Sequence, residues 1–194
     1  MKKAIDIIRA EHRALAAVLS ALKAFVDGMA EGKFAADFEL LGDMIRYLTE
    51  VPDQVHHPKE DLYLFAALRK RSPEATAILD ELEDEHRNIH AEWNALARAL
   101  DDFRSAGMSG LAAFREAVNR YYDFQWQHVS KEESRVIPLA IDVLPPQDWA
   151  AIDSAFAAND NPWEGPAGKF RQLFTRIVTI APAPIGVGPN AGAA

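Results

Sequence analysis

Residues 72–100, SPEATAILDELEDEHRNIHAEWNALARAL, decide the fold class of this chain. Ser72-Pro73-Glu74 is a typical helix start, with a capping residue, a proline at the first helical position and an early acid. Beyond it, large side chains recur at spacings of three and four, which places them on one face of a helix packed in a bundle. This face consists of Leu79, Leu82, His86, Ile89 or His90, Trp93, Leu96 and Leu100.

Three further segments show the same helical periodicity. Pro52 and Pro58 fall inside the second segment and should kink it or open its hydrogen-bond ladder, because proline has no backbone N–H to donate. The three faces run from Ile5 to Val26, from Phe38 to Leu68 and from Leu111 to Glu132. Four helices of about 25 to 35 residues with short links predict an all-α fold, an up-down-up-down four-helix bundle.

The remaining residues predict a short helical C-terminal extension. A Leu-Pro-Pro sequence at 144–146 ends the fourth helix, and apolar periodicity returns around Trp149 and from Phe170 to Ile180. The final stretch APAPIGVGPNAGAA is expected to be disordered. We therefore divide the chain into a bundle at 1–144, an extension packed on the bundle at 145–180 and a disordered tail at 181–194.

Composition excludes several classes of partner and site. The 194 residues include 21 Lys and Arg against 29 Asp and Glu, and the net charge of −8 argues against nucleic acid and anionic membranes as partners. The absence of cysteine excludes disulfides, zinc–thiolate sites and iron–sulfur clusters. The start MKKAIDIIRAEHRAL is too charged for a secretory signal and no apolar run is long enough for a membrane span, so we expect a cytoplasmic protein.

Three of the six histidines, His12, His86 and His128, occupy helix positions that should be apolar. A lone histidine of this kind is often a hydrogen-bonded core residue. Three of them in one layer are harder to explain, because each polar group buried without a partner destabilises the fold. A metal ion removes this cost, since neutral imidazole and carboxylate become its ligands.

Two pairs extend this set. His56 and Glu60 are four residues apart, as are His86 and His90, so each pair shares a helix face. Five histidines and two carboxylates exceed the needs of one tetrahedral zinc ion and suit two adjacent ions bridged by carboxylates. One ion would carry three histidines, and the other would carry two and keep a position open for a small ligand.

A weak internal repeat supports two similar half-sites. EHR at 11–13 recurs at 85–87, and KED at 59–61 recurs as KEE at 131–133. A pseudo-twofold arrangement would bring the halves together in the centre of the bundle. Three acidic residues of these motifs are most simply interpreted as solvated charges: Asp61, Glu85 and Glu132. Four nearby aromatic residues are most simply interpreted as packing residues: Tyr63, Trp93, Phe124 and Trp126.

In order and spacing, these residues resemble the hemerythrin family, or HHE cation-binding domain, over residues 4–142. The family motif is a lone His, H-x-x-x-E, H-x-x-x-H and H-x-x-x-x-[DE], one per helix. It reads here as His12 in AEHRAL, His56–Glu60 in HHPKEDLYLF, His86–His90 in EHRNIH and His128–Glu133 in HVSKEESRVIP. The resemblance implies one iron on His86, His90 and His128, a second on His12 and His56, and bridges from Glu60 and Glu133.

Two positions stay open. Helical periodicity favours Glu132, four residues after His128, as the second bridge, whereas the family spacing favours Glu133; we follow the family and expect a local distortion there. His57 could lie behind the ligands, face solvent or replace His56. We expect His57→Ala to leave both metals bound and His86→Ala to remove one.

The resemblance implies a non-heme di-iron protein that binds dioxygen or nitric oxide, with two iron ions joined by an oxide or hydroxide. Manganese or zinc would accept the same ligands. An enzyme or iron-handling protein is the alternative, through peroxide scavenging, iron donation for repair, or storage. The histidine-rich donor set favours ligand binding over catalysis. The predicted partner is a small diatomic molecule, and no protein partner is identified.

Overall fold

A computed structural model describes residues 3–159, 161–164, 168–181 and 185–187. Within these residues the chain is helical and contains no β-strand, which confirms the predicted all-α class. Two of the four long segments are single helices, α1 at Lys3–Ala30 and α5 at Thr76–Ala106. A short 3₁₀ turn at Pro73–Ala75 leads into α5, with Pro73 at its first position as predicted, but the side chain of Ser72 does not cap it.

The other two long segments contain wide, π-helical turns. The second segment is α2 at Phe38–Val51, α3 at His57–Lys59 and α4 at Ala66–Arg71, joined by π turns at Pro52–His56 and Glu60–Phe65. The fourth is α6 at Leu111–Lys131 and α7 at Ile137–Val143, joined by a π turn at Glu132–Val136. Such turns often mark functional sites, because they change which side chains face inward.

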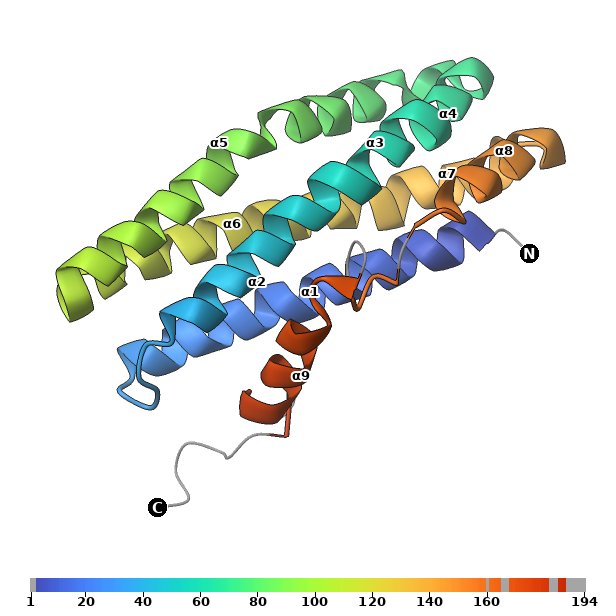
Figure 1. The fold of residues 1–194 in the computed structure, drawn as a ribbon. Coiled ribbons are helices and arrows are strands. Elements are labelled where there is room, and N and C mark those ends of the chain that lie inside the picture. Colours follow the sequence, from blue (N-terminus) through green and yellow to red (C-terminus); the bar gives the residue numbers. More distant parts are fainter. Residues whose placement is uncertain (1–2, 160, 165–167, 182–184, 188–194) are drawn as a thin grey trace.

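The four long segments lie side by side around a common core (Figure 1). Helix α1 packs on α2 and α6, and α5 packs on the same two helices from the other side. The core consists of two apolar clusters, one including Leu22, Tyr47 and Phe114 and the other including Ile8 and Leu79. Between the clusters lies a layer of buried polar side chains, to which each of the four segments contributes.

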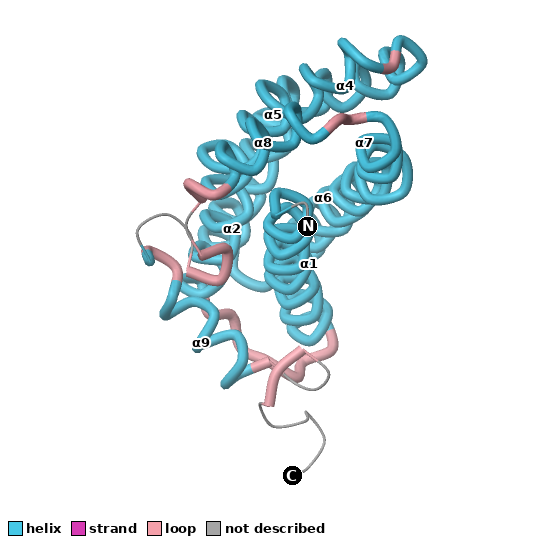
Figure 2. The backbone as a smooth tube through the Cα atoms, turned by 90° about the vertical axis from the view of Figure 1, so that its right-hand side faces the viewer, coloured by secondary structure: helices cyan, strands magenta, loops and turns pink. Residues whose placement is uncertain are grey.

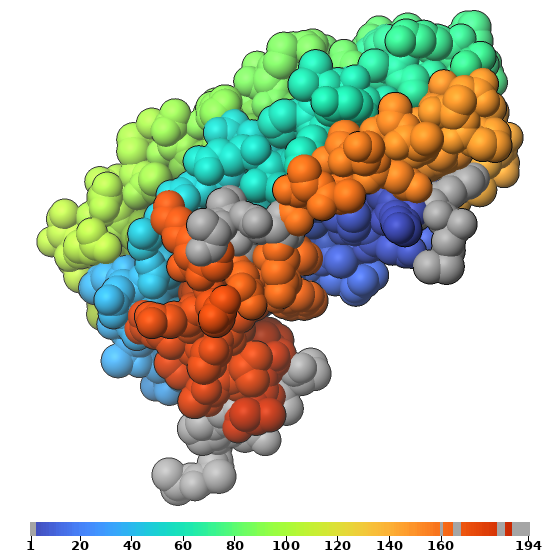
Figure 3. Space-filling model, turned by 45° about the vertical axis from the view of Figure 1, so that its right-hand side comes forward, coloured from blue at the N-terminus to red at the C-terminus, as the bar shows by residue number. Residues whose placement is uncertain are grey.

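The C-terminal extension packs on the outside of α1 and α2. Helix α8, Pro146–Phe156, lies along α1, and α9, Arg171–Ile180, contacts α1 and α2 (Figures 2 and 3). Tyr47 lies between two rings of the extension, with centroids 5.2 Å from Phe170 and 5.1 Å from Phe174. Aromatic packing on Tyr47 therefore anchors the part of the extension that contains α9 to the bundle.

Most of the predicted disordered tail, residues 182–184 and 188–194, lies outside the described part of the chain. Ala181 is buried, and the backbone N–H of Val187 donates to the Val178 carbonyl at 2.8 Å. Across the described ranges, every helix is too short or too polar to cross a bilayer.

Candidate metal centre

Seven buried side chains in the polar layer form two groups of potential metal ligands. Within each group, one nitrogen or oxygen atom per residue lies within 4.8 Å of all the others. We call them the four-residue cluster and the three-histidine cluster. The first contains His12, His56, Glu60 and Glu132, and the second contains His57, His86 and His128.

Imidazole rings face each other in both clusters. The Nε2 atoms of His12 and His56 are 3.1 Å apart, and those of His86 and His128 are also 3.1 Å apart. Two nitrogens bound to one ion at about 2.1 Å and roughly at right angles are separated by about 3 Å. Each Nε2 pair therefore has the spacing of adjacent ligands on a shared metal ion.

The opposite nitrogen of each of these four rings faces a carboxylate at 2.8 to 2.9 Å. The pairs are His12 with Glu133, His56 with Glu11, His86 with Asp61 and His128 with Glu85. The Nδ1–H donates to the carboxylate, so in the neutral ring Nε2 holds the lone pair that a metal needs. These outer carboxylates fix the tautomer and orientation of the ring, as in other histidine–metal sites.

The two buried carboxylates lie between the clusters. Glu132 places one oxygen 3.2 Å from His12 Nε2 and the other 3.3 Å from His128 Nε2. Glu60 Oε2 is 3.4 Å from His56 Nε2 and 3.9 Å from His86 Nε2. Each glutamate therefore lies within 4 Å of histidines of both clusters.

Four of the buried polar atoms have no hydrogen-bond partner among the described residues: His57 Nε2, Glu60 Oε2 and both oxygens of Glu132. Leaving such atoms unpaired is costly, because buried polar groups in folded proteins are almost always satisfied. Unpaired nitrogen and oxygen atoms converge here with the Nε2 atoms of four other imidazoles, which carry lone pairs when the rings are neutral. This donor set fits metal cations, and it contains no sulfur.

Without metal, protons neutralise part of the negative charge. Burial opposes a charge on His12 and His128, but the adjacent Glu132, with Glu133 beside His12 and Glu85 beside His128, raises each pKa to about 9. Burial raises the pKa of Glu60 well above its usual value, and the nearby charge of Glu132 raises it further. Burial lowers the pKa of His57, which stays neutral among the other histidines.

Metal binding should therefore release protons. At pH 7 the metal-free protein holds protons on His12 and His128 that a cation must displace, and the raised pKa of Glu60 adds to the release, so we expect at least about two protons per chain. Affinity for the metal should rise with pH up to about 9, where both rings become neutral. Titration calorimetry in buffers of different ionisation enthalpy measures this release.

The stability of the metal-free protein should change in the opposite direction. Groups whose pKa rises on folding stabilise the fold fully below the unfolded value of 6.5, and this stabilisation is lost as pH rises through about 9. The urea midpoint of the metal-free chain should therefore fall over this range while metal affinity increases. Metal binding at pH 7 without proton release would contradict the charges assigned to His12 and His128.

The structure differs from the predicted ligand set at two positions. His90 lies outside both clusters: its side chain is 60% exposed, 3.5 Å from Asp53 and against the ring of Trp93. The inward face of α5 passes through Ile89 instead, and Ile89 is buried. Glu133 is also outside, because it is 32% exposed and contacts Arg9 and His12 Nδ1.

His57 and Glu132 lie inside the centre in their place. Adjacent side chains on a helix are separated by about 100°, so the register of this segment decides whether His56 and His57, which belong to different clusters, both point into the core. The π turn at Pro52–His56 changes this register, and the N–H of His57 donates to the Pro52 carbonyl, five residues back. The distortion expected in the fourth segment is present, but it begins at Glu132, which keeps its ordinary place four residues after His128.

Sequence reasoning did not identify the outer carboxylates Glu11, Asp61 and Glu85, of which the last two were expected to be solvated charges. The signal was present in the EHR and KED/KEE repeats. Glu11 and Glu85 directly precede a histidine of the centre, and Asp61 directly follows Glu60. Each outer carboxylate contacts a histidine on a neighbouring helix, so its role depends on the packing of the helices.

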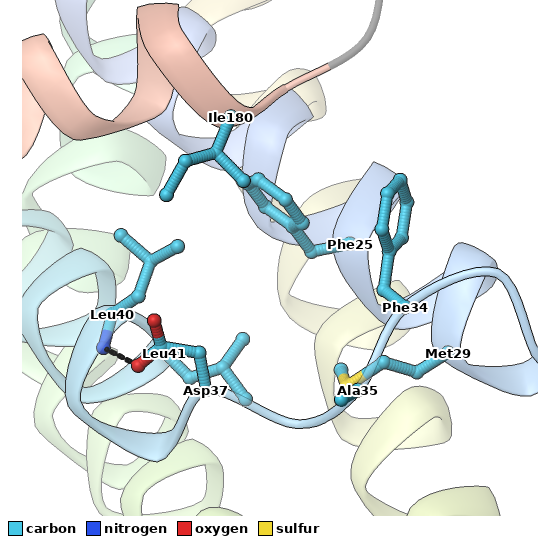
Figure 4. A pocket seen from close by; sticks show the side chains of 8 residues that line it. All are labelled: Phe25, Met29, Phe34, Ala35, Asp37, Leu40, Leu41 and Ile180. Carbon is cyan, nitrogen blue, oxygen red and sulfur yellow. Dashed lines mark hydrogen bonds between the residues drawn. The ribbon is translucent and has the colours of Figure 1, made fainter. Parts of the chain in front are cut away.

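An apolar cavity of about 230 Å³ lies at the opposite end of α1 (Figure 4). It is lined by Phe25, Met29, Phe34, Ala35, Asp37, Leu40, Leu41 and Ile180. Asp37 already accepts the backbone N–H of Leu40 at the start of α2. Phe25 is 13 residues from His12, or about 20 Å at 1.5 Å per residue, so this cavity does not belong to the histidine centre.

Comparisons with known proteins agree with this geometry. Residues 3–140 match the family described as "Hemerythrin HHE cation binding domain". An uncharacterised protein of Haemophilus influenzae is 30% identical to the chain over 79 residues, which are 41% of this chain and 45% of that protein. The chain thus spans about half the length of this curated relative. The family match covers all seven residues of the two clusters and ends before α8.

Proposed function

The chain belongs to the hemerythrin family of HHE cation-binding domains, and on that premise we propose that it is a di-iron protein that binds dioxygen or nitric oxide. The proposal includes the up-down-up-down order of the four long segments. One observation carries it: lone-pair nitrogens and unpartnered carboxylate oxygens converge in a buried layer. A cytoplasmic location stays a prediction.

The two clusters suggest how the ligands divide. The three-histidine cluster would hold one iron through His57, His86 and His128. The four-residue cluster has only His12 and His56 as imidazole ligands, with Glu60 and Glu132 shared between the two ions. The second ion would thus have fewer protein ligands, and a redox-active metal with a free position supplies the chemistry for binding a diatomic molecule.

A small apolar cavity of about 10 Å³ lies beside the centre. It lies between α1 and α6, reaches His12 and is lined mainly by apolar side chains, with Gln125 as the second polar residue. Its other lining residues are Leu15, Ala16, Leu19, Trp126 and Val129. Apolar walls hydrogen-bond poorly with water, which favours an apolar gas over water beside His12. Imidazoles also leave the centre less anionic than a carboxylate-rich site, which favours reversible binding over oxidation of a substrate.

Reconstitution tests the proposal. The anaerobic reduced protein should bind two iron ions per chain and gain a visible absorption band with dioxygen or nitric oxide that disappears when the gas is removed. Manganese and zinc, titrated in parallel, test the choice of metal, since both accept these ligands. A plateau at one ion per chain would overturn the dinuclear site. Irreversible bleaching with turnover of peroxide would favour the alternative, a di-iron enzyme.

A further inference from the structure

The two halves of the centre differ in how their outer carboxylates are held. Glu11 and Glu85 are equivalent in the EHR repeat, and each places Oε2 2.8 Å from the Nδ1 of a histidine. Lys131, from the KEE repeat, donates directly to the other oxygen of Glu85. Its counterpart Lys59 donates to Asn159 of the extension instead. The extension therefore interrupts one of two otherwise matching contacts.

The side-chain amide of Asn159 lies between Lys59 and Glu11 and contacts both. Its Oδ1 accepts from Lys59, and its Nδ2 donates to Glu11 Oε1 at 2.5 Å. The orientation of the amide follows from its neighbours, because an ammonium can only donate and an ionised carboxylate can only accept. Rotating the amide by 180° would place NH₂ against Lys59 and oxygen against Glu11.

The extension holds Asn159 in place from both sides. Before it, the buried Phe156 accepts the Asn159 backbone N–H at 2.9 Å, and Asp153 accepts the first free N–H of α1, from Ala4, at 2.7 Å. After it, the Tyr47 hydroxyl donates to the Pro162 carbonyl at 2.5 Å. These contacts fix the amide with respect to the bundle, so it can position Glu11.

We propose that Asn159 is a positioning residue that makes the two metal sites unequal, by holding Glu11, and through it His56, with a neutral donor instead of a cation. This inference rests on the proposed dinuclear function. Glu85 is 21% exposed and paired with Lys131, whereas Glu11 is 1% exposed and, besides His56, accepts a hydrogen bond from the Asn159 amide and from no cation among the described residues. More of the negative charge of Glu11 is then directed at the Nδ1–H of His56, which makes His56 the stronger ligand.

The experiment compares variants of the full chain loaded with two irons. Asn159→Ala removes the contact, and Asn159→Asp keeps an acceptor for Lys59 but places a carboxylate against Glu11. We expect either change to accelerate release of one iron to a chelator about tenfold, within the range for loss of an outer partner. The other iron should be released at the rate of the unaltered protein.

Two matched variants serve as controls. Asn161→Ala changes the same residue type in the same loop, where the side chain only accepts the Trp163 backbone N–H, and should leave both release rates unchanged. Lys131→Met removes the direct cation from Glu85, so more of the charge of Glu85 reaches His128, and this variant should slow the other phase without changing the phase that depends on Asn159. Equal acceleration of both phases in Asn159→Ala, together with a lower melting temperature, would show a merely structural role and overturn the inference.

A second measurement needs no metal. In the metal-free chain, the Nδ1–H resonance of His56 should shift in both Asn159 variants, while that of His128 stays in place. An unchanged His56 resonance together with unchanged release rates overturns the inference, whatever the metal content. Fewer than two irons in the unaltered protein overturns the dinuclear function instead, so the two failures are distinguishable.

Discussion

In the proposed di-iron centre, replacing His57 with alanine should reduce the iron content from two ions per chain to one, contrary to the expectation from the sequence, because His57 lies among the potential ligands. The ring of His57 stacks on that of His86, with centroids 4.0 Å apart and planes inclined by 16°, and it meets His128 edge-on at 5.7 Å. Its Nε2 is buried without a hydrogen-bond partner among the described residues. Alanine removes one of three imidazoles from that cluster, so its affinity for iron should fall by more than about 100-fold, the upper limit for loss of an outer partner.

His90→Ala is the matched control, because the family spacing assigns His90 the same role. Its side chain is 60% exposed at the surface of α5, so this variant should keep both irons and its absorption spectrum. Iron analysis after gel filtration distinguishes the two variants, and circular dichroism checks that His57→Ala is folded. The reverse pattern, with iron lost only from His90→Ala, would restore the ligand set predicted from the sequence.

The second large effect should come from Glu132→Gln, which we expect to weaken the binding of both iron ions. Glu132 contacts His12 in one cluster and His128 in the other, and it is 1% exposed. The amide keeps the shape of the side chain but removes the charge that both ions share. Affinity at each site should fall by at least about 100-fold, because the change removes a ligand rather than an outer partner.

Glu133→Gln is the control for this change. Glu133 contacts His12 Nδ1 and Arg9. Its loss should therefore lower the affinity only for the iron ion bound by His12, by about 10- to 100-fold. Equilibrium titration of the two variants with ferrous iron measures both effects. Two tightly bound irons in Glu132→Gln, with a deficit only in Glu133→Gln, would contradict the bridging role proposed for Glu132.

Glu132→Gln also has a measurable effect in the metal-free protein. Burial works against charge on His12 and His128, and Glu132 is a main reason why each pKa is nevertheless raised to about 9. Glu132→Gln should therefore lower both pKa values, which NMR titration of the imidazole signals can measure. This shift tests whether Glu132 faces both histidines, independently of iron.

The sequence by itself determined the helical class, the family and most of the polar layer. Periodicity placed His12, His86 and His128 on inward faces, because a regular helix repeats every 3.6 residues wherever it lies. The pair His56 and Glu60 follows from the same rule. All five are in the two clusters, and all five are buried.

Only the tertiary structure decided that Ile89 rather than His90 faces inward and that His57 joins His56 in the centre. His86 and His90 share a helix face in any helix, but the packing of α5 turns Ile89 inward and leaves His90 in solvent. His57 faces the centre because a π turn shifts the register after Pro52. Periodicity, which is a local property, favoured Glu132, which is 1% exposed, whereas the family spacing favoured Glu133, which is 32% exposed.

The outer carboxylates and Asn159 depended most on the tertiary structure. Asn159 lies 148 residues from Glu11 in sequence, and the two meet because α8 packs along α1. Hydrogen bonds between distant segments leave no periodic trace, since each partner is an ordinary polar residue within its own helix or loop. A sequence pattern therefore identifies the inward-facing ligands, whereas packing between helices selects the groups that orient them.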